Sequence, residues 1–168
     1  MPKGKAVLPG EARSWKVGHS SYLPSMRIFT IGYEGVTQAE LIETLRTAGV
    51  RLLADIRAVP LSRRPGFSKN ILAAGLREAG IDYVGLKALG TPPTGRDAAR
   101  RGDHVRLREI YAGQLELPEA IVQAEQLREM ACEQPTALLC FERAAKACHR
   151  SLLMEIAFPE AERVDLTP

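Results

Sequence analysis

The sequence has no long hydrophobic run. No uninterrupted apolar stretch approaches the roughly 20 residues that a membrane-spanning helix needs, and charged or polar residues interrupt every apolar segment. Residues 1–26 include basic residues but no apolar core of the kind found in secretory signals. We therefore expect a cytoplasmic protein with no membrane partner.

Cysteines are few as well. The chain has three, Cys132, Cys140 and Cys148. An odd number of cysteines, in a chain large enough to fold around its own core, argues against a disulfide framework. We therefore expect free thiols.

Aromatic content and net charge are both low. Aromatics make up 5% of the chain and the formal net charge is +3, which provides little stacking surface and little overall attraction for nucleic acid. Arginines are nevertheless concentrated in two segments predicted to be mostly loops, where guanidinium groups can bind phosphate or carboxylate. These arginines are Arg57, Arg63, Arg64, Arg96, Arg100, Arg101, Arg106 and Arg108. They are compatible with a nucleic-acid-binding surface or with a solvated basic rim.

A dinucleotide fingerprint is also missing. The stretch "GYEG" at residues 32–35 has two glycines, but at the wrong spacing for a phosphate-binding turn. We therefore predict neither NAD nor ATP, and no other cofactor.

The chain does contain a regular alternation of strand and helix patterns. Its 168 residues fit one domain, predicted at residues 27–168, after a flexible N-terminal extension at residues 1–26. Strands are predicted at 27–32, 50–57, 81–86, 135–141 and 161–166, and helices at 37–49, 68–80, 103–113, 118–132 and 148–158. Residues 87–102 are rich in Gly and Pro and are predicted to be a long loop.

This alternation predicts the fold class α/β, a single three-layer domain with a mostly parallel sheet of about five strands and helices on both faces. Ligands of such sheets bind beyond the carboxyl ends of the strands. Polar groups stand at the ends of three of the predicted strands, in Gly32-Tyr33-Glu34-Gly35, Asp55-Ile56-Arg57 and Cys140-Phe141-Glu142. We expect these turns to meet at one edge of the sheet and to form one site.

The stretch "LLCFERAAKACHRSLL" contains the candidate catalytic residues. Cys140 ends a predicted strand, where the nucleophile of a strand-loop-helix enzyme would lie. Cys148 opens the next helix beside His149 and Arg150, where helix N–H groups favour a thiolate or an anion. Cys140 or Cys148 is the candidate nucleophile, and His149 or Glu142 the proton carrier. Alternatively, the cysteines are buried core residues and their polar neighbours only cap and pair.

A candidate anion site lies in the stretch "ADIRAVPLSRRPGFS". Asp55 and Arg57 stand at the end of a predicted strand, and Ser62 and Arg63 follow in a loop stiffened by prolines. We expect Arg57, Arg63 and Arg150 to hold an anion, with Ser62 as a further donor and Asp55 orienting the arginines. Alternatively, this is a salt-bridged surface loop.

A metal site is not predicted from the sequence. Cys140, Cys148 and His149 could supply three ligands, but their spacing matches none of the usual structural zinc patterns. The chain also has no Cys-x-x-Cys motif.

Four motifs, in the same order, resemble the DUF488 family of bacterial and archaeal proteins of unknown function. They are "FTIGYEG", "LLADIRAVPLSRRPGFSK", "AGIDYVGLKALG" and "LLCFERAAKACHRSLL". The resemblance runs from about Ile28 to Phe158, and it implies an α/β domain but no particular reaction. The signature positions that it implies are Asp55, Arg57, Pro60, Ser62, Arg63, Cys140, Glu142, Cys148, His149 and Arg150.

Three functional hypotheses follow from the sequence. The first is a thiol-dependent enzyme that acts on an anionic small molecule or a nucleotide. The second is a nucleic-acid-binding module that uses the arginine-rich loops. The third is a non-catalytic adaptor, in which the signature residues only hold the sheet edge together.

Overall fold

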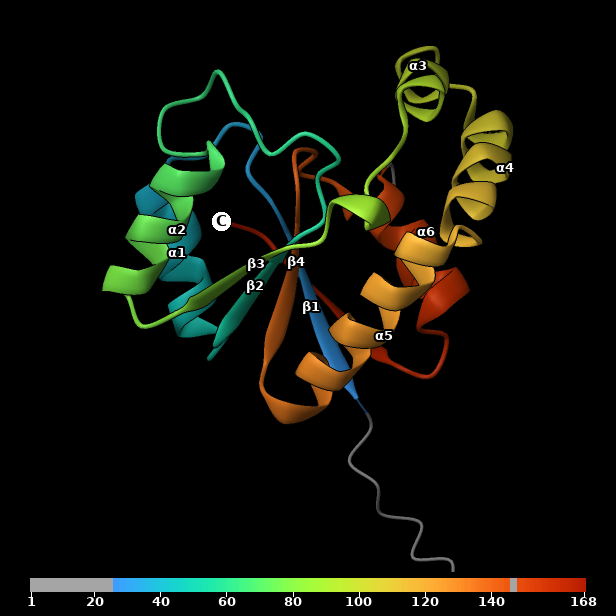
Figure 1. Cartoon of the computed structure of the whole chain (residues 1–168). Helices are drawn as coiled ribbons and strands as arrows, with labels where there is room; N and C mark the ends of the chain where they lie inside the picture. Colours follow the sequence, from blue (N-terminus) through green and yellow to red (C-terminus); the bar gives the residue numbers. More distant parts are fainter. Residues whose placement is uncertain (1–25, 146–147) are drawn as a thin grey trace, which may run out of the picture.

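The computed structural model describes residues 26–145 and 148–168, so the predicted N-terminal extension lies, except for Met26, outside the described residues. In the described part, five parallel strands form one sheet with the order β3-β2-β4-β1-β5 (Figure 1). The strands are β1 (Arg27–Gly32), β2 (Leu52–Asp55), β3 (Asp82–Gly85), β4 (Thr136–Cys140) and β5 (Glu162–Leu166). The predicted α/β class and the parallel sheet are confirmed.

Helices cover both faces of the sheet, with α1 and α2 on one face and α4, α5 and α6 on the other (Figure 1). The helices are α1 (Gln38–Thr47), α2 (Lys69–Glu78), α3 (Pro93–Arg100), α4 (His104–Leu115), α5 (Pro118–Glu133) and α6 (His149–Ala157). None of these helices is both long enough and apolar enough to span a bilayer.

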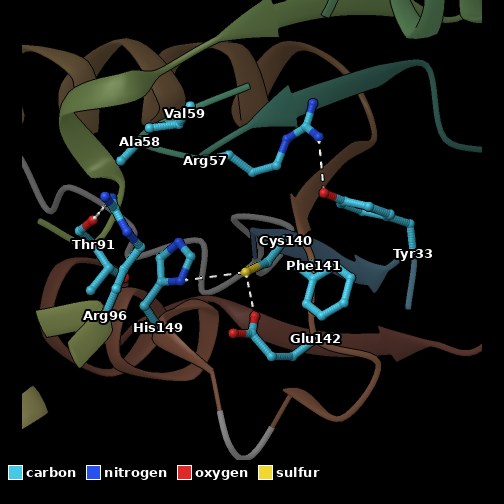
Figure 2. A pocket seen from close by; sticks show the side chains of 10 residues that line it. All are labelled: Tyr33, Arg57, Ala58, Val59, Thr91, Arg96, Cys140, Phe141, Glu142 and His149. Carbon is cyan, nitrogen blue, oxygen red and sulfur yellow. Dashed lines mark hydrogen bonds between the residues drawn. The ribbon is translucent and has the colours of Figure 1, made fainter. Parts of the chain in front are cut away.

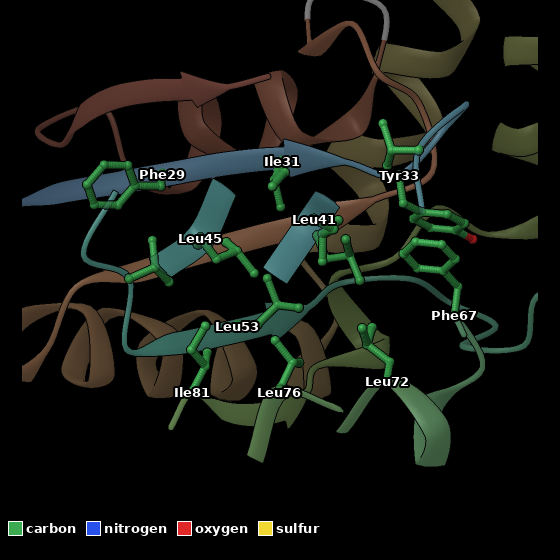
Figure 3. Close-up of a cluster of buried hydrophobic side chains, with 14 residues drawn as sticks. Phe29, Ile31, Tyr33, Leu41, Leu45, Leu53, Phe67, Leu72, Leu76 and Ile81 are labelled. Atoms are coloured by element: carbon green, nitrogen blue, oxygen red, sulfur yellow. The ribbon is translucent and has the colours of Figure 1, made fainter. Parts of the chain in front are cut away.

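The two cores follow from the period-2 alternation of side chains along the strands. On β1, Phe29 and Ile31 pack against Leu41 and Leu45 of α1 (Figure 3). Between them in sequence, Ile28 points to the opposite core, which is filled from α5 and α6. Because both faces of the central strands are covered, these strands read as nearly continuous apolar runs.

Thr37 and Glu40 form the pattern Thr-x-x-Glu, a sequence signal for a helix start, and at the start of α1 they form a capping box. The backbone N–H of Thr37 donates to Glu40 Oε2 at 2.7 Å, and the backbone N–H of Glu40 donates to Thr37 Oγ1 at 3.2 Å. The helix is followed by Gly49 at a φ of 74°, a backbone conformation that glycine adopts without a steric penalty. Together these ends fix where the chain leaves β1 and enters β2.

The prediction of a long loop at residues 87–102 is wrong. The chain forms a short 3-10 helix, η1 (Lys87–Leu89), followed by α3. Pro93 is tolerated because it lies in the first turn of α3, where a backbone N–H has no helical partner. Gly95 lies inside this helix where it packs closely against Thr91. A Cβ at this position would lie 2.6 Å from the Thr91 side chain. The Gly and Pro residues therefore start and pack a helix here.

Candidate functional site

The ends of three strands meet at one edge of the sheet. In the pairing register, Gly32 of β1 lies opposite Cys140 of β4, and Asp55 of β2 lies opposite Leu139. The turns that follow approach closely, because a Cβ on Gly32 would lie 1.9 Å from the carbonyl oxygen of Glu142. Only glycine fits at this position, so the "GYEG" turn and the turn after β4 are packed directly against each other.

Cys140, the last residue of β4, contacts two side chains that can take its proton (Figure 2). Its Sγ donates to Glu142 Oε2 at 2.8 Å and lies 3.4 Å from His149 Nδ1. On the other side of the ring, His149 Nε2 lies 3.3 Å from the carbonyl oxygen of Ile56. Since a carbonyl oxygen only accepts, Nε2 carries the hydrogen and Nδ1 presents its lone pair to Cys140.

Cys148 lies on the other side of His149, where it is the N-cap of α6. Its Sγ is 3.9 Å from His149 Nδ1 and accepts from the backbone N–H and the Nε–H of Arg150 at 3.3 and 3.1 Å. The buried Arg150 side chain also donates to the carbonyl oxygen of Glu142 at 2.5 Å. Arg150 thereby ties the start of α6 to the turn after β4.

The environment of Cys148 and His149 shifts the pKa of both side chains. Burial raises the pKa of the Cys148 thiol well above its ordinary value, and the neighbouring Cys140 sulphur adds to this, while His149 opposes it. Burial lowers the pKa of His149, but its hydrogen bond with Cys148 and the charge of Glu142 outweigh burial, so the net shift is upward. Burial therefore favours the protonated Cys148 thiol.

A buried ion pair stands beside this cluster. Arg57 donates two hydrogen bonds to Asp55, from Nε to Oδ1 at 2.8 Å and from Nη2 to Oδ2 at 2.6 Å. Its third nitrogen, Nη1, donates to the Tyr33 hydroxyl and to the carbonyl oxygen of Phe67. Tyr83 donates to Asp55 Oδ2 at 2.6 Å. Burial lowers the pKa of Arg57, but Asp55 and Tyr33 raise it above its ordinary value, so Arg57 is charged. Four hydrogen bonds leave the Arg57 guanidinium one N–H for a ligand.

A pocket of about 380 Å³ opens over Cys140, and we call it the Cys140 pocket. Its lining residues are Tyr33, Arg57, Ala58, Val59, Thr91, Arg96, Cys140, Phe141, Glu142 and His149 (Figure 2). Its volume falls within the range of small-molecule sites in proteins. Besides the thiol and its two partners, the pocket offers the cationic Arg96, whose Nη1 donates to the carbonyl oxygen of Thr91 at 2.9 Å.

The structure brings together most of the predicted site residues, but in different roles. Those that line the Cys140 pocket are Cys140, Glu142, His149 and Arg57, while Asp55, Cys148 and Arg150 are buried and do not line it. Cys148 instead lines a second pocket, with His104 and Arg108. Ser62 and Arg63 do not line the Cys140 pocket either. Arg63 is exposed, and Ser62 is held by Ser68, whose hydroxyl donates to its carbonyl oxygen at 3.2 Å.

Six lining residues were not among the predicted site residues, and three of them, Tyr33, Arg96 and Phe141, have aromatic or charged side chains. Tyr33 stacks on Phe67, with ring centroids 4.5 Å apart, and Phe141 meets the Tyr33 ring edge-on at 5.3 Å. The "GYEG" turn had marked Tyr33 as close to the site without giving it a role. Arg96 was named only among the loop arginines, since a segment interpreted as a loop gave no direction for its side chain.

Several of the other arginines in the two arginine-rich segments pair with acids on the surface. Arg100 pairs with Asp97, and Arg108 donates to both carboxylate oxygens of Glu155 at 2.9 and 2.8 Å. Each pair cancels positive charge that a phosphate backbone would otherwise meet. Nucleic-acid binding stays a prediction from the sequence alone.

Comparison with known proteins finds one match. Neither the curated proteins nor the solved structures contain a match to this chain. The family model described as "Domain of unknown function DUF488" matches residues 37–157. This range spans α1 to α6 and includes the buried ion pair as well as Cys140, Glu142, Cys148 and His149. The chain therefore belongs to the DUF488 family, whose function is unknown.

Proposed function

We propose that the protein is a thiol-dependent enzyme, a hydrolase or a transferase, that acts on an anionic small molecule. The position of Cys140 supports this most strongly, because its sulphur lines a pocket of about 380 Å³ and contacts both Glu142 and His149. Nucleophilic catalysis needs a thiol that faces both a ligand-sized space and a base. Cys148 faces away from that pocket and is engaged by Arg150, so Cys140 is the nucleophile in this proposal.

The proposed reaction begins with attack of the Cys140 sulphur on an electrophilic carbon of the substrate. The thiol proton passes to His149 Nδ1, and the leaving group departs with the electrons of the bond that breaks. His149 then returns the proton to the leaving group. Glu142, 2.8 Å from the same sulphur, favours the imidazolium by its negative charge. Water, or a second substrate, then attacks the same carbon, its proton passes through His149 to the sulphur, and the carbon–sulphur bond breaks to release Cys140.

Arg96 is the cation that we assign to the anionic group of the substrate. Arg57 also lines the pocket, but most of its donors are taken by Asp55, Tyr33 and Phe67. A nucleotide would also suit this pocket. Its phosphate is anionic, and Phe141, which is 43% exposed, provides an aromatic surface on which a base can stack.

Acylation by p-nitrophenyl esters tests this proposal. With chelator present, we expect a burst of one p-nitrophenolate per chain and an acyl group that mass spectrometry maps to Cys140. The anionic p-nitrophenyl hydrogen succinate should acylate faster than neutral p-nitrophenyl acetate. Arg96→Ala should slow acylation by the anionic ester roughly tenfold or more, as expected for loss of a charge-assisted hydrogen bond, and should leave the neutral ester unaffected.

Arg100→Ala is the matched control, since Arg100 lies on the same helix but pairs with Asp97 and does not line the pocket. It should leave both rates unchanged, and Cys140→Ser should abolish the burst. Acylation that maps to Cys132 or Cys148, or a burst that survives in Cys140→Ser, would refute the assignment of the nucleophile.

A further inference from the structure

The geometry points to a binding site for a thiophilic divalent cation, best matched by Zn²⁺, formed by Cys140, Glu142, Cys148 and His149. One ligand atom from each side chain lies within 4.8 Å of all the others: two sulphurs, a carboxylate oxygen and a ring nitrogen of His149. Thiolate, imidazole and carboxylate are the ligands that zinc takes in proteins. This inference goes beyond the proposed thiol chemistry and stands without it.

The separations are close to those of a tetrahedral zinc site. With Zn–S bonds of about 2.3 Å and Zn–N bonds of about 2.0–2.1 Å, neighbouring ligand atoms of a tetrahedron lie roughly 3.3–3.8 Å apart. His149 Nδ1 is 3.4 Å from Cys140 Sγ and 3.9 Å from Cys148 Sγ, and Cys140 Sγ is 2.8 Å from Glu142 Oε2. Side-chain movements of about 1 Å would therefore bring four ligand atoms around one ion.

The hydrogen bonds of the cluster also indicate a cation. His149 Nε2 lies 3.3 Å from the carbonyl oxygen of Ile56, so in the neutral imidazole Nε2 carries the hydrogen and Nδ1 accepts. The ionised Glu142 carboxylate only accepts as well. Cys140 has a single S–H for both of these acceptors, which lie 2.8 and 3.4 Å away, and the other sulphur near Nδ1, that of Cys148, is farther, at 3.9 Å. A bound cation would satisfy both acceptors and both sulphurs together.

The surroundings of the cluster resemble the outer shell of a metal site. A metal-bound histidine usually donates its second ring N–H to a carbonyl or carboxylate oxygen, as His149 does to Ile56. Cys148 Sγ accepts two N–H groups of Arg150, which would stabilise a thiolate. Two thiolates and one carboxylate exceed the charge of a divalent cation by one, and the guanidinium of Arg150 offsets that excess.

Cation binding has a consequence for the Cys140 pocket. Three of the four groups, Cys140, Glu142 and His149, line that pocket, which gives a cation a path from solvent. A coordinated Cys140 sulphur cannot attack a substrate, so the cation-bound and thiol-reactive forms exclude each other. Spacing along the sequence did not indicate the site, because the turn after β4 folds back to place Cys140 and Glu142 against the start of α6.

Cobalt titration of the full chain, after chelator treatment and desalting, tests the inference. We expect one Co²⁺ per chain, the sulphur-to-cobalt charge-transfer absorption of a thiolate site, the strong visible bands of tetrahedral cobalt, and loss of all these signals on adding Zn²⁺. Cys132→Ser is the matched control, because Cys132 is exposed on α5, and it should bind Co²⁺ as the wild type does. Cys140→Ser and Cys148→Ser should each weaken binding by more than about 100-fold, beyond the effect of removing an outer-shell partner.

A wild-type spectrum without charge-transfer bands would overturn the inference, as would full binding in both Cys140→Ser and Cys148→Ser. If circular dichroism shows that a buried cysteine variant does not fold, the wild-type spectrum and the variant Glu142→Gln decide instead, because Glu142 is only half-buried. Glu142→Gln should weaken Co²⁺ binding at least about tenfold. Unchanged binding in this variant would contradict Glu142 as a ligand. Ester acylation is measured with chelator present, so a chain that acylates without binding Co²⁺ retains the proposed function and loses only the cation site.

Discussion

Asp55→Asn is expected to lower the free energy of unfolding by about 3–5 kcal/mol, the usual cost of removing one partner of a buried ion pair. The Asp55 and Arg57 side chains are 0% and 6% exposed, and their closest contact is 2.6 Å. The neutral amide would leave the charge of Arg57 uncompensated in the interior. It would also weaken the hydrogen bond from Tyr83.

Glu162→Gln is the matched control, because it also neutralises an acid that pairs with an arginine. The pair of Glu162 with Arg27 spans 3.0 Å, but its side chains are about half exposed, and exposed pairs contribute about 0–1 kcal/mol. Urea unfolding of both variants gives the comparison. An Asp55→Asn loss no larger than that of Glu162→Gln would show that the buried pair contributes little to the stability of the fold.

Gly32→Ala is expected to destabilise the protein by about 3 kcal/mol, at the upper end of the range for overpacking. The new Cβ would lie 1.9 Å from the carbonyl oxygen and 2.6 Å from the carbonyl carbon of Glu142. Backbone atoms cannot rotate out of the way as the end of a side chain can, so the turn after β4 must move. Because Glu142 contacts Cys140, the same substitution should also lower the rate of Cys140 acylation.

Gly113→Ala makes the same chemical change where there is space. Nothing lies within 4 Å of a Cβ at Gly113, which lies inside α4, so we expect it to stabilise the protein by about 0.5–1 kcal/mol. The two variants are compared by chemical unfolding. Equal effects at Gly32 and Gly113 would contradict the close approach of the two turns.

The fold could be predicted from the sequence because local signals agreed with each other. Apolar alternation gave the strands, and caps such as Thr37 with Glu40 gave the helix ends. The exception was α3, where Pro93 and Gly95 were interpreted as breakers. Their compatibility with a helix depends on Pro93 being in the first turn and on the packing of Gly95 against Thr91, and neither is visible in a single sequence.

The position of the candidate site could be predicted, but not the orientation of its side chains. The strand ends gave the sheet edge at which Cys140, Glu142 and His149 meet. The sequence did not show that Arg150 would turn inward to Cys148, or that Ser62 would be held by Ser68. These orientations depend on tertiary contacts that neither periodicity nor spacing encodes. For the same reason, Arg96 could not be assigned to the pocket before α3 was known.

In the proposed function Cys140 is a nucleophile whose proton His149 accepts, and site-mapped alkylation by the neutral reagent iodoacetamide measures this reactivity. With chelator present at neutral pH, Cys140 should be modified faster than the exposed Cys132, although Cys140 is 4% exposed. His149→Gln should slow modification of Cys140 about a hundredfold, the lower range for loss of a general base, and leave Cys132 unaffected. Modification of Cys140 no faster than that of Cys132 in the wild type, or a Cys140 rate unchanged in His149→Gln, would contradict the account.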